Sequence, residues 1–494
     1  MRNVLFFLIF LVLLSSCAVS KTPHKEFRGV WIATVANIDW PKNPNDSPEK
    51  KKEDFIAILN FYQKLNFNAA IVQVRTAGDA FYKTELAPWS KYLSGKEGAS
   101  PQGFDDPLQW MIQETHKRGM EFHAWLNPYR ATFDLDTLAL SKEHDFYQHP
   151  DWMVKYGKKY YYNPGIPAVQ EKFAKVVEEL VTRYELDAIH FDDYFYPYKV
   201  EGEAFNDSTT FQTYGLPNQS VENWRRSNVD SLVKNVHHTI KKNKPWVQFG
   251  ISPFGVWKNK STDPMGSDTR AGQTTYEDLY ADPVLWVKEG WLDYLAPQAY
   301  WSMDYPPASH KAVGSWWNNA TPNTNLYLGN GAYKIKNNSD KAWERKNEIP
   351  KQLTFAREQG NIDGNIFFSA KSLIGQHENV TKTLKKKFYR LPAENPTTLN
   401  KNPRSIQLPG IESIEKKNEM LNICISHTDS VPRFLNYYQL NGNGKQLIGK
   451  NYLSESENSG CFQLKLTKKQ QRSEVGISIS DAYGNETATL PLNF

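Results

Sequence analysis

Two adjacent carboxyl groups, Asp192 and Asp193, lie in the stretch 186–197 (LDAIHFDDYFYP). They follow a short apolar run and precede three aromatic residues. Paired carboxyl groups can divide acid and base work, because their surroundings can keep one protonated while the other stays ionised. The simpler interpretation is a solvated Asp-Asp turn that ends a strand. The rest of the sequence is needed to distinguish a catalytic pair from a solvated turn.

The apolar run before the aspartates predicts a strand, in which alternate side chains point to opposite faces. His190 and Asp192 therefore share one face, and Ile189 and Phe191 share the other. If the apolar pair packs under a helix, Asp192 points into the space that the sheet encloses, near the carboxyl end of its strand. That end carries the chemistry in parallel α/β architectures.

Strand and helix patterns alternate eight times along residues 26–391. The other predicted strands are 28–35, 68–75, 121–127, 247–252, 292–300, 325–331 and 364–370, and the predicted helices are 47–65, 107–118, 167–184, 221–242, 282–289, 307–318, 341–359 and 378–388. This alternation indicates a parallel sheet with right-handed crossovers, and eight units favour a closed (β/α)8 TIM barrel. The sequence shows no GxGxxG or P-loop motif, so we expect no nucleotide cofactor.

Polar side chains collect at the predicted carboxyl ends of six of these strands. Arg75 ends the second strand, Asn127 the third, and Gln298 the sixth. Polar groups inside a barrel are costly unless they are paired or used. Six strands that share this feature predict a site at one end of the barrel.

The carboxyl-terminal part of the chain differs in residue composition and hydrophobic pattern. Residues 392–404 are rich in Pro, Asn and Thr and predict a linker. Residues 405–494 show short alternating runs, separated by turn signals such as Asn441-Gly442. This pattern predicts a small antiparallel β-sandwich of the immunoglobulin or fibronectin III type, which we interpret as an accessory domain. Cys424 and Cys461 could form one disulfide in an exported protein, although the sequence alone does not bring them together.

The amino terminus predicts export. Residues 1–16 carry one charge and a short apolar run, which is typical of a signal peptide and too short to cross a bilayer. The sequence LSSC that ends at Cys17 resembles a bacterial lipobox, which implies cleavage before Cys17 and lipidation of that residue. Residues 17–25 would then be a tether to a membrane, and we expect the outer membrane with attachment on the periplasmic face of the cell envelope. The alternative is an ordinary secretory signal with a chance cysteine.

Charge and aromatic content narrow the classes of partner. The formal net charge is 59 − 54 = +5, which is too mild to indicate nucleic acid binding. Aromatic residues reach 14% of the chain, and rings at loop positions suit stacking on the apolar faces of sugars. The rings beside predicted strand ends are Trp31, Trp40, Tyr129, Tyr194, Tyr196, Trp257, Tyr300 and Trp301.

Several long motifs resemble one family. FRGVWIATVANIDWP, VQVRTAGDAFY, HKRGMEFHAWLNPYR, HFDDYFYP, GISPFGVW and DYLAPQAYW are similar to those of the glycosyl hydrolase-like 10 family, the former domain of unknown function 187. The resemblance covers residues 26–391. It implies an exported (β/α)8 glycoside hydrolase, often a lipoprotein, that cleaves peptidoglycan glycan strands, particularly strands that lack their peptides. It also implies a site around the aspartates of the fourth strand.

Glycoside hydrolysis generally needs an acid and an ionised carboxylate. Asp192 is the first candidate, Asp193 is a candidate acid, and Asp304 is the next acid because adjacent residues on an extended chain point apart. A loose match to the chitinase-like DxxDxDxE pattern aligns Asp187 and Asp192 but lacks the catalytic Glu. A substrate-assisted route through a 2-acetamido group therefore stays open. The residues expected to contact substrate are Arg75, Asp79, Asn127, Tyr129, Arg130, His190, Tyr194, Tyr196, Trp257, Gln298, Tyr300 and Trp301.

Two other classes of function remain possible at this stage. His123, His190 and Asp192 lie on neighbouring predicted strands and could bind a metal in a hydrolase or deacetylase, although neither histidine belongs to a short metal-binding motif. Alternatively, the barrel binds glycans without cleaving them, since one fold can host different functions. We expect a glycosidase without metal or cofactor.

Overall fold

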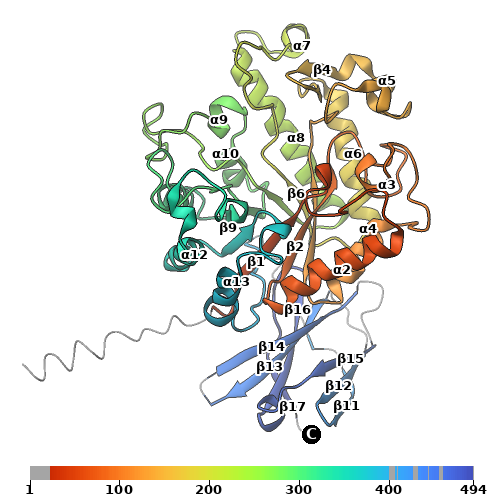
Figure 1. Cartoon of the computed structure of the whole chain (residues 1–494), viewed down its shortest axis with the longest axis vertical. Helices are drawn as coiled ribbons and strands as arrows, with labels where there is room; N and C mark the ends of the chain where they lie inside the picture. Colours follow the sequence, from red (N-terminus) through yellow and green to blue (C-terminus); the bar gives the residue numbers. More distant parts are fainter. Residues whose placement is uncertain are drawn as a thin grey trace, which may run out of the picture.

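Within residues 23–399, eight parallel strands close into a barrel surrounded by helices, as the sequence predicts. The structure is a computed structural model that describes residues 23–399, 407–408, 410–426, 432–442, 444–454 and 460–492. The predicted signal peptide and Cys17 therefore lie outside the described residues, as does part of the predicted linker. Figure 1 shows the barrel with the carboxyl-terminal β-sheets at one end of it.

The barrel strands follow each other around the sheet with parallel neighbours, and the last strand pairs with the first. They are β1 (Phe27–Ile32), β2 (Ala69–Arg75), β3 (Glu121–Leu126), β6 (Ala188–Phe191), β7 (Gln248–Ile251), β8 (Tyr294–Leu295), β9 (Asn325–Asn330) and β10 (Gly364–Phe367). Strand β8 is much shorter than the predicted 292–300. Pro297 has no N–H to donate to a ladder, so the chain continues from there as a loop.

Helices pack on the outside of the barrel at the predicted places. The main helices are α2 (Pro48–Lys64), α4 (Pro107–His116), α6 (Pro167–Arg183), α8 (Val221–Asn243), α10 (Pro283–Lys288), α11 (His310–Ala320), α12 (Glu348–Glu358) and α13 (Glu378–Thr383). Helix α2 begins where expected, because the Ser47 side chain accepts a hydrogen bond from the Lys50 N–H and Pro48 fits the first turn. The predicted helix 341–359 is split into the 3₁₀ turn η5 (Lys341–Glu344) and α12.

Short helices and turns lie at the carboxyl ends of the barrel strands. They are the helices α3 (Lys91–Ser94), α5 (Asp145–Gln148), α7 (Ser208–Tyr214) and α9 (Thr275–Asp278), and the 3₁₀ turn η4 (Ala332–Lys334). A hairpin of β4 (Met153–Tyr156) and β5 (Lys159–Tyr162) is inserted between β3 and α6. Its second strand docks on the loop after β3, where the Tyr162 N–H donates to the Tyr129 carbonyl at 2.8 Å. The hairpin lies at the end of the barrel away from the blue sandwich (Figure 1).

The two faces of the barrel strands bury different side chains. On the outside, Ile189 and Phe191 join the helix-facing core, and Phe191 packs edge-on to Phe173 of α6. The inside is filled by aromatic rings, among which Phe27 and Tyr327 stack at 4.0 Å. Gly250 makes room for one of them, since a Cβ at that position would come within 1.9 Å of the Tyr294 ring. The predicted alternation along β6 is therefore correct.

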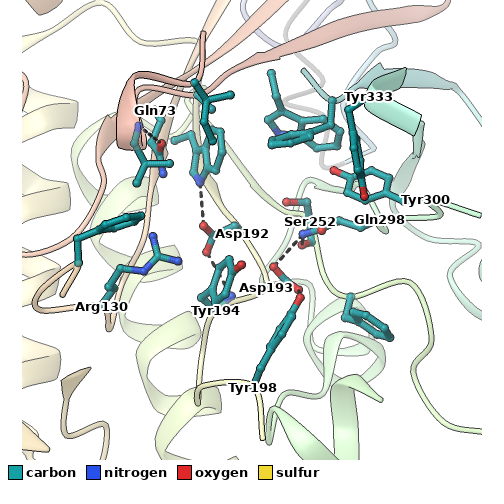
Figure 2. Close-up of a pocket in the computed structure, with 18 of the residues that line it drawn as sticks. Gln73, Arg130, Asp192, Asp193, Tyr194, Tyr198, Ser252, Gln298, Tyr300 and Tyr333 are labelled. Carbon is teal, nitrogen blue, oxygen red and sulfur yellow. Dashed lines mark hydrogen bonds between the residues drawn. The ribbon is translucent and has the colours of Figure 1, made fainter. Parts of the chain in front are cut away.

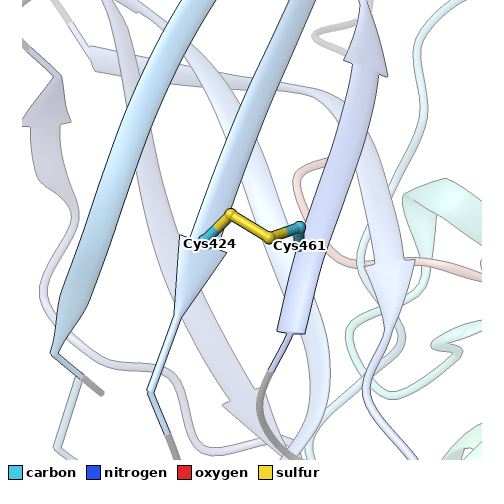
Figure 3. Close-up of a disulfide and its surroundings, with 2 residues drawn as sticks. All are labelled: Cys424 and Cys461. Carbon is cyan, nitrogen blue, oxygen red and sulfur yellow. A yellow bond between two sulfur atoms is a disulfide. The ribbon is translucent and has the colours of Figure 1, made fainter.

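The described carboxyl-terminal residues form two antiparallel sheets, as predicted. One contains β11 (Ile411–Lys417), β12 (Met420–Ile425) and β15 (Gly460–Lys465), and the other contains β14 (Gly444–Tyr452), β13 (Pro432–Asn441), β16 (Val475–Asp481) and β17 (Leu490–Leu492). Cys424 and Cys461 are directly opposite each other on β12 and β15 and form a disulfide (Figure 3). The pairing that the sequence left open is thus present.

The sandwich packs against the amino-terminal ends of the barrel strands. The Tyr452 ring stacks on His116 of α4 with 3.6 Å between ring centroids, and the Ser454 hydroxyl donates to Glu185 at 2.7 Å. We call this end the barrel floor. Among the described residues, helices both long and apolar enough to span a bilayer are absent.

Candidate active site

A cavity of about 470 Å³ opens at the carboxyl ends of the barrel strands (Figure 2). Every strand of the barrel, or the loop that follows it, contributes to its wall. Of the residues predicted from the sequence to form the site, seven line this cavity: Arg130, Asp192, Asp193, Tyr194, Gln298, Tyr300 and Trp301. The expectation of a site at this end of the barrel is therefore matched by a cavity of a size suited to sugar rings.

Asp192 points from the end of β6 into the cavity and is held on both oxygens. Trp125 Nε1 donates to Oδ2 at 3.2 Å, and Asn127 Nδ2 lies 3.1 Å from Oδ1 and 3.2 Å from Oδ2. The Tyr194 N–H donates to Oδ1 at 3.2 Å. Burial raises the pKa of Asp192, while the Arg130 charge and these donors act in the opposite direction and limit the rise.

Asp193 faces the same cavity, although neighbours on an extended chain would point apart. The chain bends directly after Phe191, and the Phe195 N–H donates back to the Asp193 carbonyl at 3.0 Å. Gln298 Nε2 donates to Asp193 Oδ1 at 2.9 Å, and the Tyr198 hydroxyl donates to Oδ2. Figure 2 shows these contacts on the side of Asp193 away from Arg130.

The two carboxyl groups have different proton affinities. Burial first, and then the negative charge of Asp192, raise the pKa of Asp193 to about 7. Two carboxylates that share one low-dielectric site cannot both ionise freely. Near neutral pH the pair can therefore hold one proton on Asp193 while Asp192 carries the charge, which is the division of roles that acid-assisted bond cleavage uses.

The loop that follows β3 supplies a third side of the site. The Arg130 N–H donates to Asn127 Oδ1 at 2.8 Å, so Asn127 orients both this loop and Asp192. The Arg130 guanidinium lies 4.5 Å from the centre of the Tyr194 ring. Asn127 itself is fully buried behind Asp192, which makes it a residue that positions the carboxylate.

Comparison with known sequences assigns the chain to a family. The sequence profile described as Glycosyl hydrolase-like 10 matches residues 26–345, which is more than half of the chain. The chain belongs to this family. The protein is 43% identical over 423 residues to the glycosyl hydrolase YngK of Bacillus subtilis strain 168, covering 84% of this chain and 82% of that one. It is 38% identical over 374 residues to the glycosyl hydrolase DigH of Escherichia coli strain K12, covering 71% of this chain and 84% of that one.

Among solved structures, the glycoside hydrolase domain of PgaB (BpsB) from Bordetella bronchiseptica aligns with this chain at 12% identity and a TM-score of 0.49. That alignment covers 74% of this chain and 99% of the other. A likeness at this distance carries no argument about the site. The geometry of this glycosyl hydrolase-like 10 protein itself therefore indicates the roles of its residues.

His190 lies below the cavity in a buried chain of hydrogen bonds. Trp31 Nε1 donates to His190 Nε2 at 3.2 Å, and Ser252 Oγ is 3.0 Å from the same nitrogen. The Tyr294 hydroxyl lies 2.9 Å from His190 Nδ1 and 2.8 Å from His123 Nδ1. Burial, followed by the nearby His123, lowers the pKa of His190 well below its usual value, so the ring stays neutral.

The metal alternative has little support in this geometry. The second nitrogen of His123 is 3.1 Å from Glu121, so all four ring nitrogens of the two histidines already have partners. In the described part of the chain, groups of three or more His, Cys, Asp or Glu side chains that could hold a metal are absent. The histidines instead support the barrel interior beneath Asp192.

Arg75 and Asp79 lie behind the wall of the cavity. Asp79 caps the turn after β2, where the N–H groups of Thr76 and Ala77 each donate to its Oδ1 at 2.9 Å. Arg75 is 2% exposed, and its Nη1 donates to the Asp79 carbonyl at 3.3 Å. The structure thus places these two residues in the loop scaffold.

Other predicted residues are also distributed away from the cavity. Tyr129 and Tyr196 are almost fully buried in the outer core, and the Trp257 indole donates to Asp282 at 3.0 Å. Asp304 is exposed and lies beside Lys311 in a separate surface hollow. Asp187 precedes β6 at the barrel floor, opposite the cavity, so the chitinase-like alignment does not bring it to Asp192.

Several residues that line the cavity were not among the predicted site residues. They are supplied by loops and by the inserted hairpin, and they include Phe133, Lys159, Tyr198, Ser252, Phe254, Tyr333, Lys334 and Phe368. Tyr198 had a visible signal, since it ends the aromatic cluster that begins directly after the aspartates. Lys159 had none, because the sequence pattern did not predict the hairpin that carries it.

Proposed function

We propose that the protein is a glycoside hydrolase that cleaves peptidoglycan glycan strands, with Asp193 as the general acid and Asp192 as the ionised partner. The observation that carries this proposal is the pair of adjacent carboxyl groups that face one cavity and have different hydrogen-bond partners. Burial and the charge of Asp192, which raise the pKa of Asp193 to about 7, support Asp193 as the protonated member. Membership of the glycosyl hydrolase-like 10 family, whose curated relatives are named glycosyl hydrolases, supports the reaction class.

The proposed reaction begins with proton transfer from Asp193 to the glycosidic oxygen. The bond between this oxygen and the anomeric carbon then breaks, and positive charge develops on the anomeric carbon and the ring oxygen. Asp192 stabilises that charge electrostatically in a water-poor site. Asp193, now ionised, later takes a proton from the water that completes hydrolysis, which restores the starting state of the pair.

The hydrogen bonds of Asp192 favour a fixed carboxylate over a covalent nucleophile. Donors from Trp125, Asn127 and the Tyr194 backbone already engage both of its oxygens. In the proposed route the 2-acetamido oxygen of the substrate attacks the anomeric carbon, and Asp192 balances the positive charge of the resulting ring. Such substrate assistance requires an N-acetylated amino sugar, which peptidoglycan strands contain.

Aromatic side chains opposite Arg130 provide a surface for sugar rings. Tyr300 and Tyr333 lie together on that side in Figure 2, with their ring centroids 6.0 Å apart. The Trp301 ring meets Phe254 at 5.6 Å on the same wall. Such rings bind the apolar faces of sugars while leaving their hydroxyl groups available for hydrogen bonds.

We further propose that the mature chain is anchored through lipid at Cys17, on the periplasmic side of the outer membrane. The segment from Cys17 to Phe27 spans ten residues and could extend at most about 35 Å. Strand β1 begins at the barrel floor, beside the sandwich. The tether would therefore leave from the floor, and the cavity would open away from the membrane toward the glycan strands.

The test uses the soluble mature chain with peptide-stripped and intact peptidoglycan, and identifies new reducing ends by mass spectrometry. We expect cleavage of the stripped strands by the wild type and a loss of about a thousandfold for Asp192→Asn. Asp304→Asn removes an exposed carboxylate at a separate hollow and should keep wild-type activity. Absence of new reducing ends with the wild type would refute the proposal, and loss of activity in Asp304→Asn alone would move the acid to that residue.

A further inference from the structure

The charges on the cavity wall are unbalanced in favour of cations. Its titratable lining consists of Arg130, Lys159 and Lys334 against Asp192 and Asp193, apart from tyrosines. The sum is +1 when both aspartates are ionised and +2 when Asp193 holds a proton. A cavity whose wall carries a net charge attracts ligands of the opposite sign, whereas a site for neutral sugars alone gains nothing from this excess.

Two of these cations are neighbours on the side formed by the loop after β3 and by the inserted hairpin. The Lys159 Nζ lies 5.0 Å from the centre of the Phe133 ring, and the Arg130 guanidinium carbon lies 5.8 Å from the same centre. We call Arg130 and Lys159 the cationic wall. Burial and the charge of Arg130 lower the pKa of Lys159, as expected for two neighbouring cations.

The cationic wall has hydrogen-bonding capacity that the protein leaves unused. Arg130 is 5% exposed, its Nη1 donates to the Thr76 carbonyl at 3.1 Å, and its buried Nε has no partner. Within the described residues, Lys159 Nζ forms neither a hydrogen bond nor an ion pair. A half-buried cation without a partner is costly, and an anionic ligand would remove that cost.

Two other arginines of this protein, Arg28 and Arg225, show a different arrangement. Arg28 pairs with Glu26 at 2.7 Å, and Arg225 pairs with Asp207 at 2.6 Å. Those pairs hold elements of the fold together. Arg130 and Lys159 instead present their charges to the cavity that contains Asp192 and Asp193.

We propose that Arg130 and Lys159 bind a free carboxylate of the substrate, so that the preferred substrate is an acidic glycan whose sugars carry unmodified carboxyl groups. This inference rests on the proposed glycosidase function. In a peptidoglycan strand, removal of the peptide leaves a carboxylate on the ether substituent of every second sugar. When the peptide is attached, that group is a neutral amide and offers no charge to Arg130 and Lys159. The cationic wall therefore gives a physical reason for selecting stripped strands.

The experiment compares stripped strands with the same strands after reduction of their carboxyl groups to alcohols. Lys159→Gln removes the charge from the wall, and Lys158→Gln is the matched control, because Lys158 is the adjacent, exposed residue. For the wild type we expect kcat/KM to be roughly ten- to hundredfold higher on the carboxylate strands. Lys159→Gln should lose most of this advantage through a higher KM, and should match the wild type on the reduced strands. Lys158→Gln should behave as the wild type on both.

Equal wild-type activity on both strands, or an equal loss in Lys159→Gln on both, would overturn the inference. Binding of the two strands to the Asp192→Asn protein, measured by calorimetry, separates this inference from the proposed function. Suppose that the wild type cleaves neither strand, but that the Asp192→Asn protein binds the carboxylate strands more tightly than the reduced strands. If adding Lys159→Gln to Asp192→Asn removes this preference, the inference about the cationic wall is supported and the glycosidase proposal fails. If binding shows no preference, the inference fails.

Discussion

Arg433 of the sandwich forms a buried ion pair with Asp187 of the barrel, with 3.1 Å between Nε and Oδ1. The other oxygen of Asp187 accepts the Phe122 N–H at 2.7 Å and lies 2.7 Å from His116 Nε2. Burial tends to raise the pKa of Asp187, but Arg433 and His116 outweigh it and hold this pKa well below the usual range. The sandwich therefore supplies a charge that the barrel floor requires.

We predict that Arg433→Met destabilises the whole protein by about 3–5 kcal/mol, because it leaves Asp187 as a buried charge without its main partner. Urea denaturation measures the effect, and Arg472→Met at an exposed position of the sandwich is the control. Because the pKa of Asp187 is lowered in the folded state, the pair stabilises the fold above about pH 4 and loses this effect as the pH falls. Unchanged stability of Arg433→Met at pH 7 would show that the ion pair contributes nothing.

The same ion pair bears on whether the barrel folds without the sandwich. The pattern alone suggests that a chain ending near Leu391 folds, since the eighth helix already closes the barrel. The structure shows that such a chain would lose Arg433 and expose Asp187, His116 and the floor residues around them. A buried contact between residues 246 positions apart leaves no local signal, so the sequence pattern does not predict this dependence.

Local patterns predicted the barrel well and the edges of the sandwich poorly. Each barrel strand is buried on both faces, so its apolar run is visible in the sequence. Strand β11 (IESIEKK) and strand β14 (GKQLIGKNY) bury few side chains, and their polar residues hide the strand pattern. The hairpin β4–β5 was missed for a related reason, because it is short and lies over the barrel rather than in it.

The alternation of side chains along a strand predicts one residue of the candidate site directly. Alternation along β6 places Asp192 inward, and the structure agrees. Arg75 ends strand β2 and Arg130 lies in the loop after β3, yet one supports a loop and the other faces the cavity. That difference depends on how the loops fold over one another, which neither residue type nor spacing encodes.

We predict that Cys17→Ser releases the mature protein from membranes and leaves its activity unchanged, because anchoring through lipid needs the cysteine thiol. Fractionation of cells that express the variant, followed by detection of the protein in the soluble envelope fraction, tests this. A variant that remains bound to membranes would show that another part of the chain carries the attachment.

We predict that Arg75→Ala lowers stability more than it lowers activity. The substitution removes a fully buried side chain that donates to the Asp79 carbonyl and lies 5.9 Å from the Phe173 ring centre. Such a loss costs about 1–3 kcal/mol, while kcat/KM per folded molecule should stay within a few-fold of the wild type. Thermal melting and kinetics on the same samples separate the two effects. A normal melting temperature with abolished turnover would instead mean that Arg75 contacts the substrate.

Tyr198 should tune the proton affinity of Asp193. Its hydroxyl donates to Asp193 Oδ2, and this hydrogen bond favours the ionised carboxylate and lowers its pKa. We therefore expect Tyr198→Phe to raise the pKa of Asp193 and to move the alkaline limb of the kcat/KM profile to higher pH, by roughly 0.5–1 unit. Tyr333→Phe removes a hydroxyl from the same cavity without touching Asp193 and should leave the limb in place. An alkaline limb that does not move in Tyr198→Phe would show that the Tyr198 hydroxyl does not control the pKa of Asp193.

Asp193→Asn should have opposite effects on activity and on stability. The pKa of Asp193 is raised to about 7 in the folded protein, against about 4 in an unfolded chain. The folded wild type is therefore fully stabilised by this group below about pH 4, loses that stability as the pH rises toward 7, and carries the whole penalty above it. Asparagine cannot ionise, so the variant should melt at a higher temperature than the wild type at pH 8, by about 2 °C or more, with a smaller difference at pH 4.5.

The turnover of Asp193→Asn should fall by about 10²–10⁴-fold on glycan strands, and by much less on an aryl glycoside whose leaving group needs no proton. A variant that is inactive on both substrates, or that is less stable than the wild type at pH 8, would show that Asp193 is not the protonated member of the pair.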